Sequence, residues 1–191
     1  LSLKSGTLSL YCYYDVATKP SKISFNESKE KLFSLVNNAT DQWLISDAPL
    51  GAFLSGGIDS SIVVAMASQK VAGLKTFAVT FPDSQFHNEG PFAKLIANKY
   101  KTDHHEIPLT QENLYNSVDL VLEYLDEPFA DTSAIPSFAL CDQVGKHVRV
   151  ALSGDGADEI FGGYQKHKAQ LISQRLQRLP LPFQLISKIT E

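Results

Sequence analysis

The sequence has little of what several classes of functional site require. Its two cysteines, Cys12 and Cys141, form no CxxC motif and no cluster with histidine, so neither a disulfide framework nor a zinc site is indicated. No apolar run approaches the roughly 18 residues of a membrane span, and no signal-peptide pattern opens the chain. The net charge of -4 offers no basic surface to nucleic acid or to an anionic membrane. We therefore expect a soluble, cytoplasmic protein without nucleic-acid or membrane partners.

The composition is typical of a single globular domain with one hydrophobic core. The 191 residues are 43% hydrophobic and 20% charged. The first residue is Leu1 and not methionine, and the apolar-periodic stretch 169–191 stops without a cap or a closing strand. We therefore interpret the sequence as a fragment of a longer protein.

The first 48 residues precede the main pattern of the chain. Residues 1–14 alternate around a Lys-Ser-Gly turn, which predicts a hairpin. Residues 15–27 have the proline, serine and lysine content of a linker. Apolar side chains then recur at Leu32, Val36, Ala39 and Trp43, which predicts a helix that covers the following domain with this face.

From Pro49 onward, apolar strands alternate with helices. In the helix expected at 88–100, Asn88 is the predicted N-cap. The apolar residues of that helix share one face, namely Phe92, Leu95, Ile96 and Tyr100. Because strands that alternate with helices need right-handed crossovers, the pattern predicts an α/β fold with a doubly wound parallel sheet. The expected strands are 52–55, 74–81, 102–109 and 148–153, and the expected helices are 60–70, 88–100, 114–125 and 133–146.

Two glycine-rich turns follow strands of this sheet, at the carboxyl ends where such folds bind ligands. The first turn, residues 55–60 (SGGIDS), joins a strand to a helix. Its glycines let the backbone approach an anion closely, and its serines add hydroxyl donors. A bare phosphate would repel Asp59, which suits instead a magnesium ion that accompanies a polyphosphate. The alternative is an ordinary Gly-Gly turn whose serine and aspartate only cap the helix.

The second turn lies in residues 152–164 (LSGDGADEIFGGY) and also follows a strand. Its Gly-x-Gly begins a dinucleotide fingerprint, but Glu159 occupies the last glycine position, so that interpretation fails. Asp158 and Glu159 open the next helix. The plain structural explanation is that these carboxylates favour a helix N-terminus.

Both turns resemble those of one enzyme family. Residues 55–60 fit SGGxDS at all six positions, the signature of the PP-loop ATP pyrophosphatases, which include asparagine, argininosuccinate and GMP synthetases. Residues 152–164 match the LSG(D/E)G(A/S)DE(V/I/L)FGGY stretch of asparagine synthetases and the related beta-lactam synthetases. The chain therefore resembles the synthetase domain of glutamine-hydrolysing asparagine synthetases. The resemblance implies the adenine nucleotide alpha hydrolase-like fold, with three α/β/α layers.

The absence of a Walker A loop agrees with this resemblance. The pattern GxxxxGK followed by serine or threonine occurs nowhere in the chain. A Walker loop wraps the phosphates for cleavage at the terminal one. The PP-loop of the resembled family grips the leaving pyrophosphate and exposes the α-phosphorus, so the expected chemistry is transfer of AMP.

The resemblance divides the chain into three parts. We expect residues 1–15 to be the tail of a preceding glutaminase domain, and 16–48 to be a linker and a covering helix. Residues 49–191 are then the N-terminal part of a truncated ATP-binding domain. The family's catalytic lysine belongs to a later part of the domain, beyond Glu191, so no residue here is assigned that role.

The resemblance also implies roles for individual residues. Asp59 and Asp158 are the expected magnesium ligands, and Asp155, where many members have glutamate, bears on the formation of aspartyl-AMP. Leu54 and Val79 match positions that wrap the adenine, although strand core explains both equally well. The predicted catalytic residues are Asp155, Asp59 and Glu159. The predicted ATP-binding residues are Leu54, Ser55, Gly56, Gly57, Asp59, Ser60, Val79, Ser153, Gly154, Asp158 and Tyr164.

The implied activity is the amidation of aspartate to asparagine by an ATP-dependent carbon–nitrogen ligase. It uses ATP and Mg²⁺, passes through β-aspartyl-AMP and releases AMP and pyrophosphate. Ammonia comes from a glutaminase domain of the same parent chain, and a homodimer is compatible with the resemblance. The first alternative is a beta-lactam synthetase or another carboxylate amidotransferase of the family. The second is an ATP-binding module that has no turnover in this fragment.

Several other polar residues have a simpler interpretation. His104 and His105 are adjacent on a strand, so they face opposite sides and cannot chelate one metal together. His147 and His167 are isolated in the sequence. Residues 126–133 (DEPFADTS) match a family segment that borders the substrate pocket, or else form a polar loop that Ser133 caps. Lys166 and Lys168 are close enough to the second turn to approach phosphate, but a solvated helix face is the default interpretation.

Overall fold

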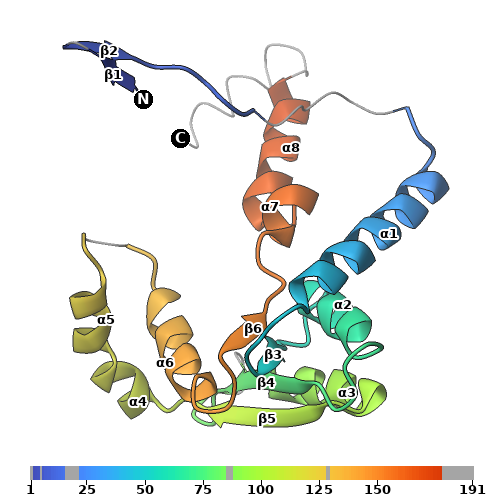
Figure 1. The fold of residues 1–191 in the computed structure, drawn as a ribbon, viewed down its shortest axis with the longest axis vertical. Coiled ribbons are helices and arrows are strands. Elements are labelled where there is room, and N and C mark those ends of the chain that lie inside the picture. Colours follow the sequence, from blue (N-terminus) through green and yellow to red (C-terminus); the bar gives the residue numbers. More distant parts are fainter. Residues whose placement is uncertain (1, 5, 16–21, 85–87, 128–129, 178–191) are drawn as a thin grey trace. The chain divides into compact units, whose positions relative to one another are not determined.

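Figure 1 shows the computed structural model, which describes residues 2–4, 6–15, 22–84, 88–127 and 130–177. The chain divides into two compact units between Leu35 and Val36. In the first unit, β1 (Ser2–Lys4) and β2 (Thr7–Ser9) pair antiparallel around Gly6, whose φ of 78° suits glycine. The predicted hairpin is therefore confirmed. None of the described helices is both long and apolar enough to cross a membrane.

The second unit contains a parallel sheet of four strands. They are β3 (Leu50–Phe53), β4 (Lys75–Thr80), β5 (Asp103–Pro108) and β6 (Val150–Leu152), in the order β5-β4-β3-β6. After β3 the chain adds β4 and β5 on one side, and it returns to place β6 on the other side. The doubly wound parallel sheet is therefore confirmed. The switch point lies between β3 and β6, the strands that precede the two glycine-rich turns.

Helices cover both faces of the sheet. α2 (Ile58–Ala67) and α3 (Gly90–Tyr100) contact each other and the sheet, while α4 (Gln111–Asn116), α5 (Val118–Tyr124) and α6 (Ala134–Val144) form a separate group (Figure 1). Ala52, Leu54 and Ala78 are buried against residues of α2 and α3. Phe77 points to the opposite face and is buried with Val144 and Val148. This alternation along the strands gives the three expected layers.

The buried residues of α1 (Phe25–Trp43) and α3 are small ones. α1 begins at Phe25, inside the expected linker, and Leu32 and Trp43 are 40% and 71% exposed. Its single buried side chain among the described residues is Thr40, which donates to the Val36 carbonyl. In α3, Gly90, Ala93 and Ala97 are the buried residues, whereas Phe92 and Leu95 are exposed. Small residues line the buried face because α3 lies so close to the sheet that a Cβ on Gly90 would come 2.6 Å from Thr80 Cγ2.

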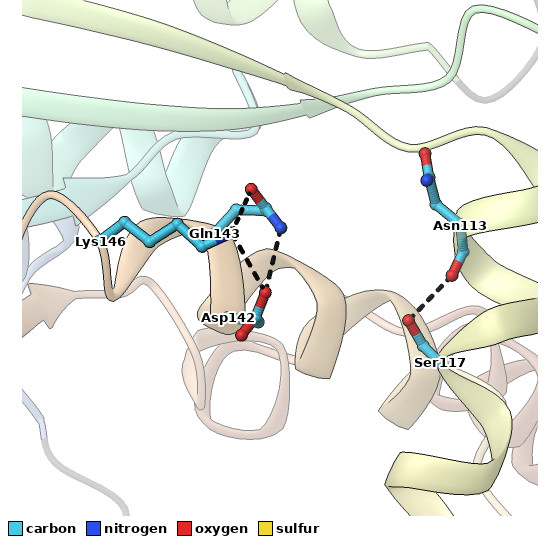
Figure 2. A network of polar contacts seen from close by, with 5 residues as sticks. All are labelled: Asn113, Ser117, Asp142, Gln143 and Lys146. Atoms are coloured by element: carbon cyan, nitrogen blue, oxygen red, sulfur yellow. Dashed lines mark hydrogen bonds and ion pairs between the residues drawn. The ribbon is translucent and has the colours of Figure 1, made fainter.

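Other helix boundaries differ from the predicted ones because of local hydrogen bonds. The helix expected at 114–125 is two helices, α4 and α5, which meet at Ser117; its hydroxyl donates to the Asn113 carbonyl at 2.9 Å (Figure 2). Glu89 is the N-cap of α3 in place of Asn88, although Asn88 Oδ1 accepts from the Gly90 amide at 3.1 Å. After β6 the chain forms α7 (Ala157–Phe161) and α8 (Gln165–Gln177).

Candidate active site

The first glycine-rich turn is held in shape by its own serines. Ser55 and Ser60 hydroxyls lie 2.9 Å apart, the Ser60 hydroxyl also contacts the Gly57 carbonyl at 3.3 Å, and the Gly57 amide donates to Ser55 Oγ at 3.2 Å. Gly56 has a φ of 82°, and a Cβ there would lie 2.6 Å from Phe92 Cβ of α3. Only glycine fits this position, because it needs both a left-handed backbone and a close approach to a helix.

This turn presents backbone donors at the start of α2. The N-cap of α2 is Gly57, and no side chain caps the helix. The amides of a first helical turn have no partner within the helix, and the helix dipole makes that end positive. The loop and the N-terminus of α2 together can therefore receive an anion such as a phosphate.

The second glycine-rich turn touches the first one. A Cβ on Gly154 would lie 2.7 Å from the Ser60 amide nitrogen and 2.9 Å from the Asp59 carbonyl carbon. The two turns are therefore in direct contact at Gly154, as their positions after neighbouring strands β3 and β6 require. Gly156, with a φ of 90°, then caps α7. The two glycine-rich turns, which the sequence analysis assigned to one site, therefore lie side by side.

The segment after α7 orients two of the carboxylates. A Cβ on Gly163 would overlap Oδ1 of Asp158, and the Gly163 amide donates to the Asp158 carbonyl at 3.0 Å. The Tyr164 hydroxyl donates to Glu159 Oε1 at 2.6 Å. This bond lowers the pKa of Glu159, because it stabilises the ionised carboxylate, and raises the pKa of Tyr164 to about 12. Glu159 is therefore an ionised acceptor whose position is fixed by Tyr164.

Both turns open into one cavity of about 580 Å³. Asp59, Asp155, Asp158 and Glu159 line it, and no lysine, arginine or histidine is among the described residues that do so. The described part of the chain holds no group of three or more acidic, histidine or cysteine side chains suited to a metal. Two carboxylates are nevertheless an adequate donor set for Mg²⁺, which completes its shell with phosphate oxygens and water. The carboxylate-lined cavity thus fits Mg²⁺ bound together with a polyphosphate.

A smaller cavity of about 250 Å³ adjoins the first. The two cavities share four lining residues, namely Phe53, Ser55, Ser137 and Leu140. The smaller cavity therefore lies next to the first glycine-rich turn. Leu54 and Val79 line it, and Leu54 is only 1% exposed. The walls are mainly apolar, as a planar base requires.

The predicted site residues divide between these cavities. Gly56 and Gly57 form the turn and are not among the residues that line either cavity. Leu54 and Val79 line the smaller cavity. The others line the larger one, namely Ser55, Asp59, Ser60, Ser153, Gly154, Asp155, Asp158, Glu159 and Tyr164.

Sequence reasoning missed the contribution of α6. Ser137 and Cys141 line the larger cavity together with Leu140. Ser137 and Cys141 are four residues apart, so they share one face of the helix. A small polar pair at this spacing on a helix next to the sheet is the signal that could have identified them. Burial raises the pKa of Cys141, which keeps its thiol protonated.

The DEPFADTS segment lies near a third cavity, of about 840 Å³, which Thr132 and Ser133 help to line. This cavity of about 840 Å³ is larger than the carboxylate-lined one, but it is not the proposed centre of chemistry, because neither glycine-rich turn lines it. Asp131 accepts from the Ser133 amide at 2.9 Å, which lowers the pKa of Asp131, and Ser133 is the N-cap of α6. Residues 128–129 of the segment lie outside the described part of the chain.

The histidines of β5 have structural partners. His104 Nδ1 lies 3.0 Å from the hydroxyl of the buried Thr76, and burial lowers the pKa of His104. His105 contacts different residues: its ring stacks on Phe77 at 5.3 Å and lies 5.0 Å from the ring of His147. The two adjacent histidines thus face opposite sides, as predicted. His147, which is isolated in the sequence, lies against His105 in the fold.

Comparisons with known proteins converge on one group. The family model described as Asparagine synthase matches residues 31–190. Glutamine-hydrolyzing asparagine synthetase 1 of Bacillus subtilis is 33% identical over 175 residues, which cover 92% of this chain and 28% of that protein. The putative glutamine-hydrolyzing asparagine synthetase 2 of Methanocaldococcus jannaschii is 37% identical over 137 residues, 71% of this chain and 26% of that protein. The chain therefore spans about a quarter of the length of these curated relatives.

Among solved structures, the NH3-dependent NAD synthetase from Campylobacter jejuni gives a TM-score of 0.42 at 16% identity, over 74% of this chain and 61% of that chain. A likeness of this degree supports no inference about the function of the chain.

Proposed function

Because the chain belongs to the asparagine synthase family, we propose that it is the ATP-binding part of a cytoplasmic ligase that amidates aspartate to asparagine. An oxygen of the aspartate side-chain carboxylate attacks the α-phosphorus of ATP, the bond from that phosphorus to the bridging oxygen breaks, and pyrophosphate leaves. Ammonia then attacks the acyl carbon of β-aspartyl-AMP, and AMP leaves as the amide forms. The ammonia comes from glutamine, hydrolysed by a glutaminase domain of the same protein, whose tail we assign to residues 1–15.

The observation that carries this proposal is the contact between the two glycine-rich turns. Gly154 lies against Ser60 and Asp59, so the hydroxyl-bearing turn and the carboxylate-bearing turn form one wall. Ser55, Ser60 and the open N-terminus of α2 supply donors for the β- and γ-phosphates. Ser153 and Gly154 contact the nucleotide from the neighbouring strand. Such a wall holds the leaving pyrophosphate and leaves the α-phosphorus open to the cavity.

The carboxylates have separate tasks in this proposal. Asp59 and Asp158 hold Mg²⁺, which when bound neutralises charge on the pyrophosphate. Asp155 lines the same cavity, and from the family resemblance we assign it to the formation of β-aspartyl-AMP. Glu159, fixed by Tyr164, is an ionised acceptor beside them. The adenine occupies the smaller cavity, between Leu54 and Val79.

The products of the full-length enzyme test this function. With aspartate, ATP and Mg²⁺ we expect stoichiometric AMP and pyrophosphate, formed only when aspartate is present. Asp155→Asn should slow pyrophosphate release at least tenfold, whereas the control Asp142→Asn, on the surface of α6, should leave it unchanged. Formation of ADP and phosphate would exclude the proposed chemistry. Turnover with another carboxylate but not with aspartate would identify a different amidotransferase of the family.

A further inference from the structure

The carboxylate-lined cavity has an unbalanced charge. Four acidic side chains line it, with no cation among its described lining residues, yet the proposed ligand is itself a polyanion. One Mg²⁺ offsets only part of this negative charge. A cation at the edge of the cavity would therefore increase the affinity for a polyphosphate.

Several lysines are engaged elsewhere in the structure. Lys70 pairs with Asp41, and Lys94 lies 3.4 Å from Glu106. Lys146 lies 3.6 Å from Asp142 and donates to Gln143 at 3.0 Å, at the end of α6 (Figure 2). None of these three lysines lines the carboxylate cavity.

Lys166 is placed differently. Its Nζ lies 4.5 Å from the centre of the Tyr164 ring, and Tyr164 both lines the cavity and donates to Glu159. After the Tyr164 hydrogen bond, which is the main cause, the charge of Lys166 also contributes to the lowered pKa of Glu159. Lys166 belongs to the first turn of α8, which contains no acidic residue. A positive charge is therefore anchored at the edge of the cavity.

We propose that Lys166 is a phosphate-binding residue of this site, whose ammonium group leaves the Tyr164 ring to contact the β- and γ-phosphates of ATP and then the pyrophosphate product. The proposal rests on the function proposed above. A cation–π contact at an exposed ring is weaker than a charge-assisted hydrogen bond to phosphate, so a bound polyphosphate draws the ammonium away. The flexible stem of lysine allows this movement while Tyr164 stays bound to Glu159.

The chain offers a matched control for this role. Lys168 is also exposed and lies two residues further along α8. Two residues rotate a helix by about 200°, so Lys168 lies on nearly the opposite side of α8. Loss of either lysine changes the net charge equally, but only Lys166 is seated on Tyr164.

Calorimetric titration of the 191-residue chain tests the proposal with Mg²⁺ and, in turn, ATP, pyrophosphate and AMP. We expect Lys166→Ala to weaken the binding of ATP and pyrophosphate about tenfold and that of AMP less than twofold. Lys166→Arg should retain most of the affinity, and Lys168→Ala should bind all three ligands as the original chain does. Circular dichroism of each variant confirms that the fold is intact.

Two results would overturn the proposal while leaving the proposed function in place. One is equal weakening of ATP binding by Lys166→Ala and Lys168→Ala, which would reflect net charge alone. The other is equal weakening of AMP and ATP binding in Lys166→Ala. If the original chain does not bind ATP with Mg²⁺ at all, the proposed function fails and this inference fails with it.

Discussion

The contact at Gly154 allows a sharp prediction about the two turns. In Gly154→Ala the new methyl group would lie 2.7 Å from the Ser60 amide nitrogen, whereas ordinary contacts begin at 3.4 Å. The atoms that the methyl group would meet are the Ser60 amide nitrogen, the Asp59 carbonyl carbon and Asp59 Cβ. Because these atoms cannot rotate away, the two turns must part by about 0.7 Å at this point. Overpacking of this kind costs about 1–3 kcal/mol of unfolding free energy. For a chain of this size that lowers Tm by roughly 2–12 °C.

The affinity for ATP should fall as well as the stability. A displacement approaching 1 Å at a site that depends on geometry costs on the order of a hundredfold in function, so we expect Mg²⁺-ATP affinity to fall at least tenfold. Thermal unfolding and calorimetry measure the two effects in parallel. Gly145→Ala is the control, because Gly145 has a helical φ of -58° and its Cβ would come within 3.2 Å of the Cys141 carbonyl, so that a shift of only about 0.2 Å accommodates it. If Gly154→Ala melts and binds ATP as the original chain does, the turns do not meet as described.

Three further predictions concern ionisable groups. Tyr164→Phe removes the 2.6 Å bond to Glu159 and keeps the ring, so carbon NMR titration should show the pKa of Glu159 rising toward 4.5; an unchanged value contradicts the assigned cause. Asp59→Asn should abolish most of the Mg²⁺ dependence of ATP binding, seen by titration at several Mg²⁺ concentrations, and a wild-type dependence would exclude Asp59 as a ligand. Burial lowers the pKa of His104 below 6.5 in the native state. As the pH falls, the imidazole of His104 therefore takes up its proton at a higher pH in the unfolded chain than in the native one. Stability should therefore fall as the pH drops through about 6.5 in denaturant titrations, and His104→Gln should flatten this slope; an equally steep slope refutes it.

The parallel sheet and the position of the two turns at the ends of its strands followed from the sequence because they depend on strong local signals. Apolar strands that alternate with helices leave few topologies, and glycine turns after β3 and β6 mark the carboxyl edge of a parallel sheet. The faces of α1 and α3 were not predictable in the same way. Periodicity selects the large side chains, but the buried residues of α3 are Gly90, Ala93 and Ala97, and a Cβ on Gly90 would come 2.6 Å from Thr80 Cγ2.

In the candidate site, too, some residues were predicted from the sequence and others were not. The family resemblance of the two motifs pairs Asp59 with Asp158, and in the structure both residues line one cavity beside the neighbouring strands β3 and β6. The contact of Tyr164 with Glu159 was not predictable from the motifs, since it depends on the left-handed Gly162 between them. Ser137 and Cys141 reach the cavity from α6, after a long crossover, and no motif links them to the turns. Long-range packing decided the positions of Ser137 and Cys141.

The central claim is that the turns at 55–60 and 153–159 form one site for the polyphosphate of ATP. The most direct test is a titration of the 191-residue chain with ATP at saturating Mg²⁺, repeated in the presence of increasing pyrophosphate. Because both ligands use the same donors, pyrophosphate should compete fully with ATP, and both should lose affinity in Asp59→Asn. Binding of ATP that pyrophosphate does not displace, or no binding of either, would contradict the claim.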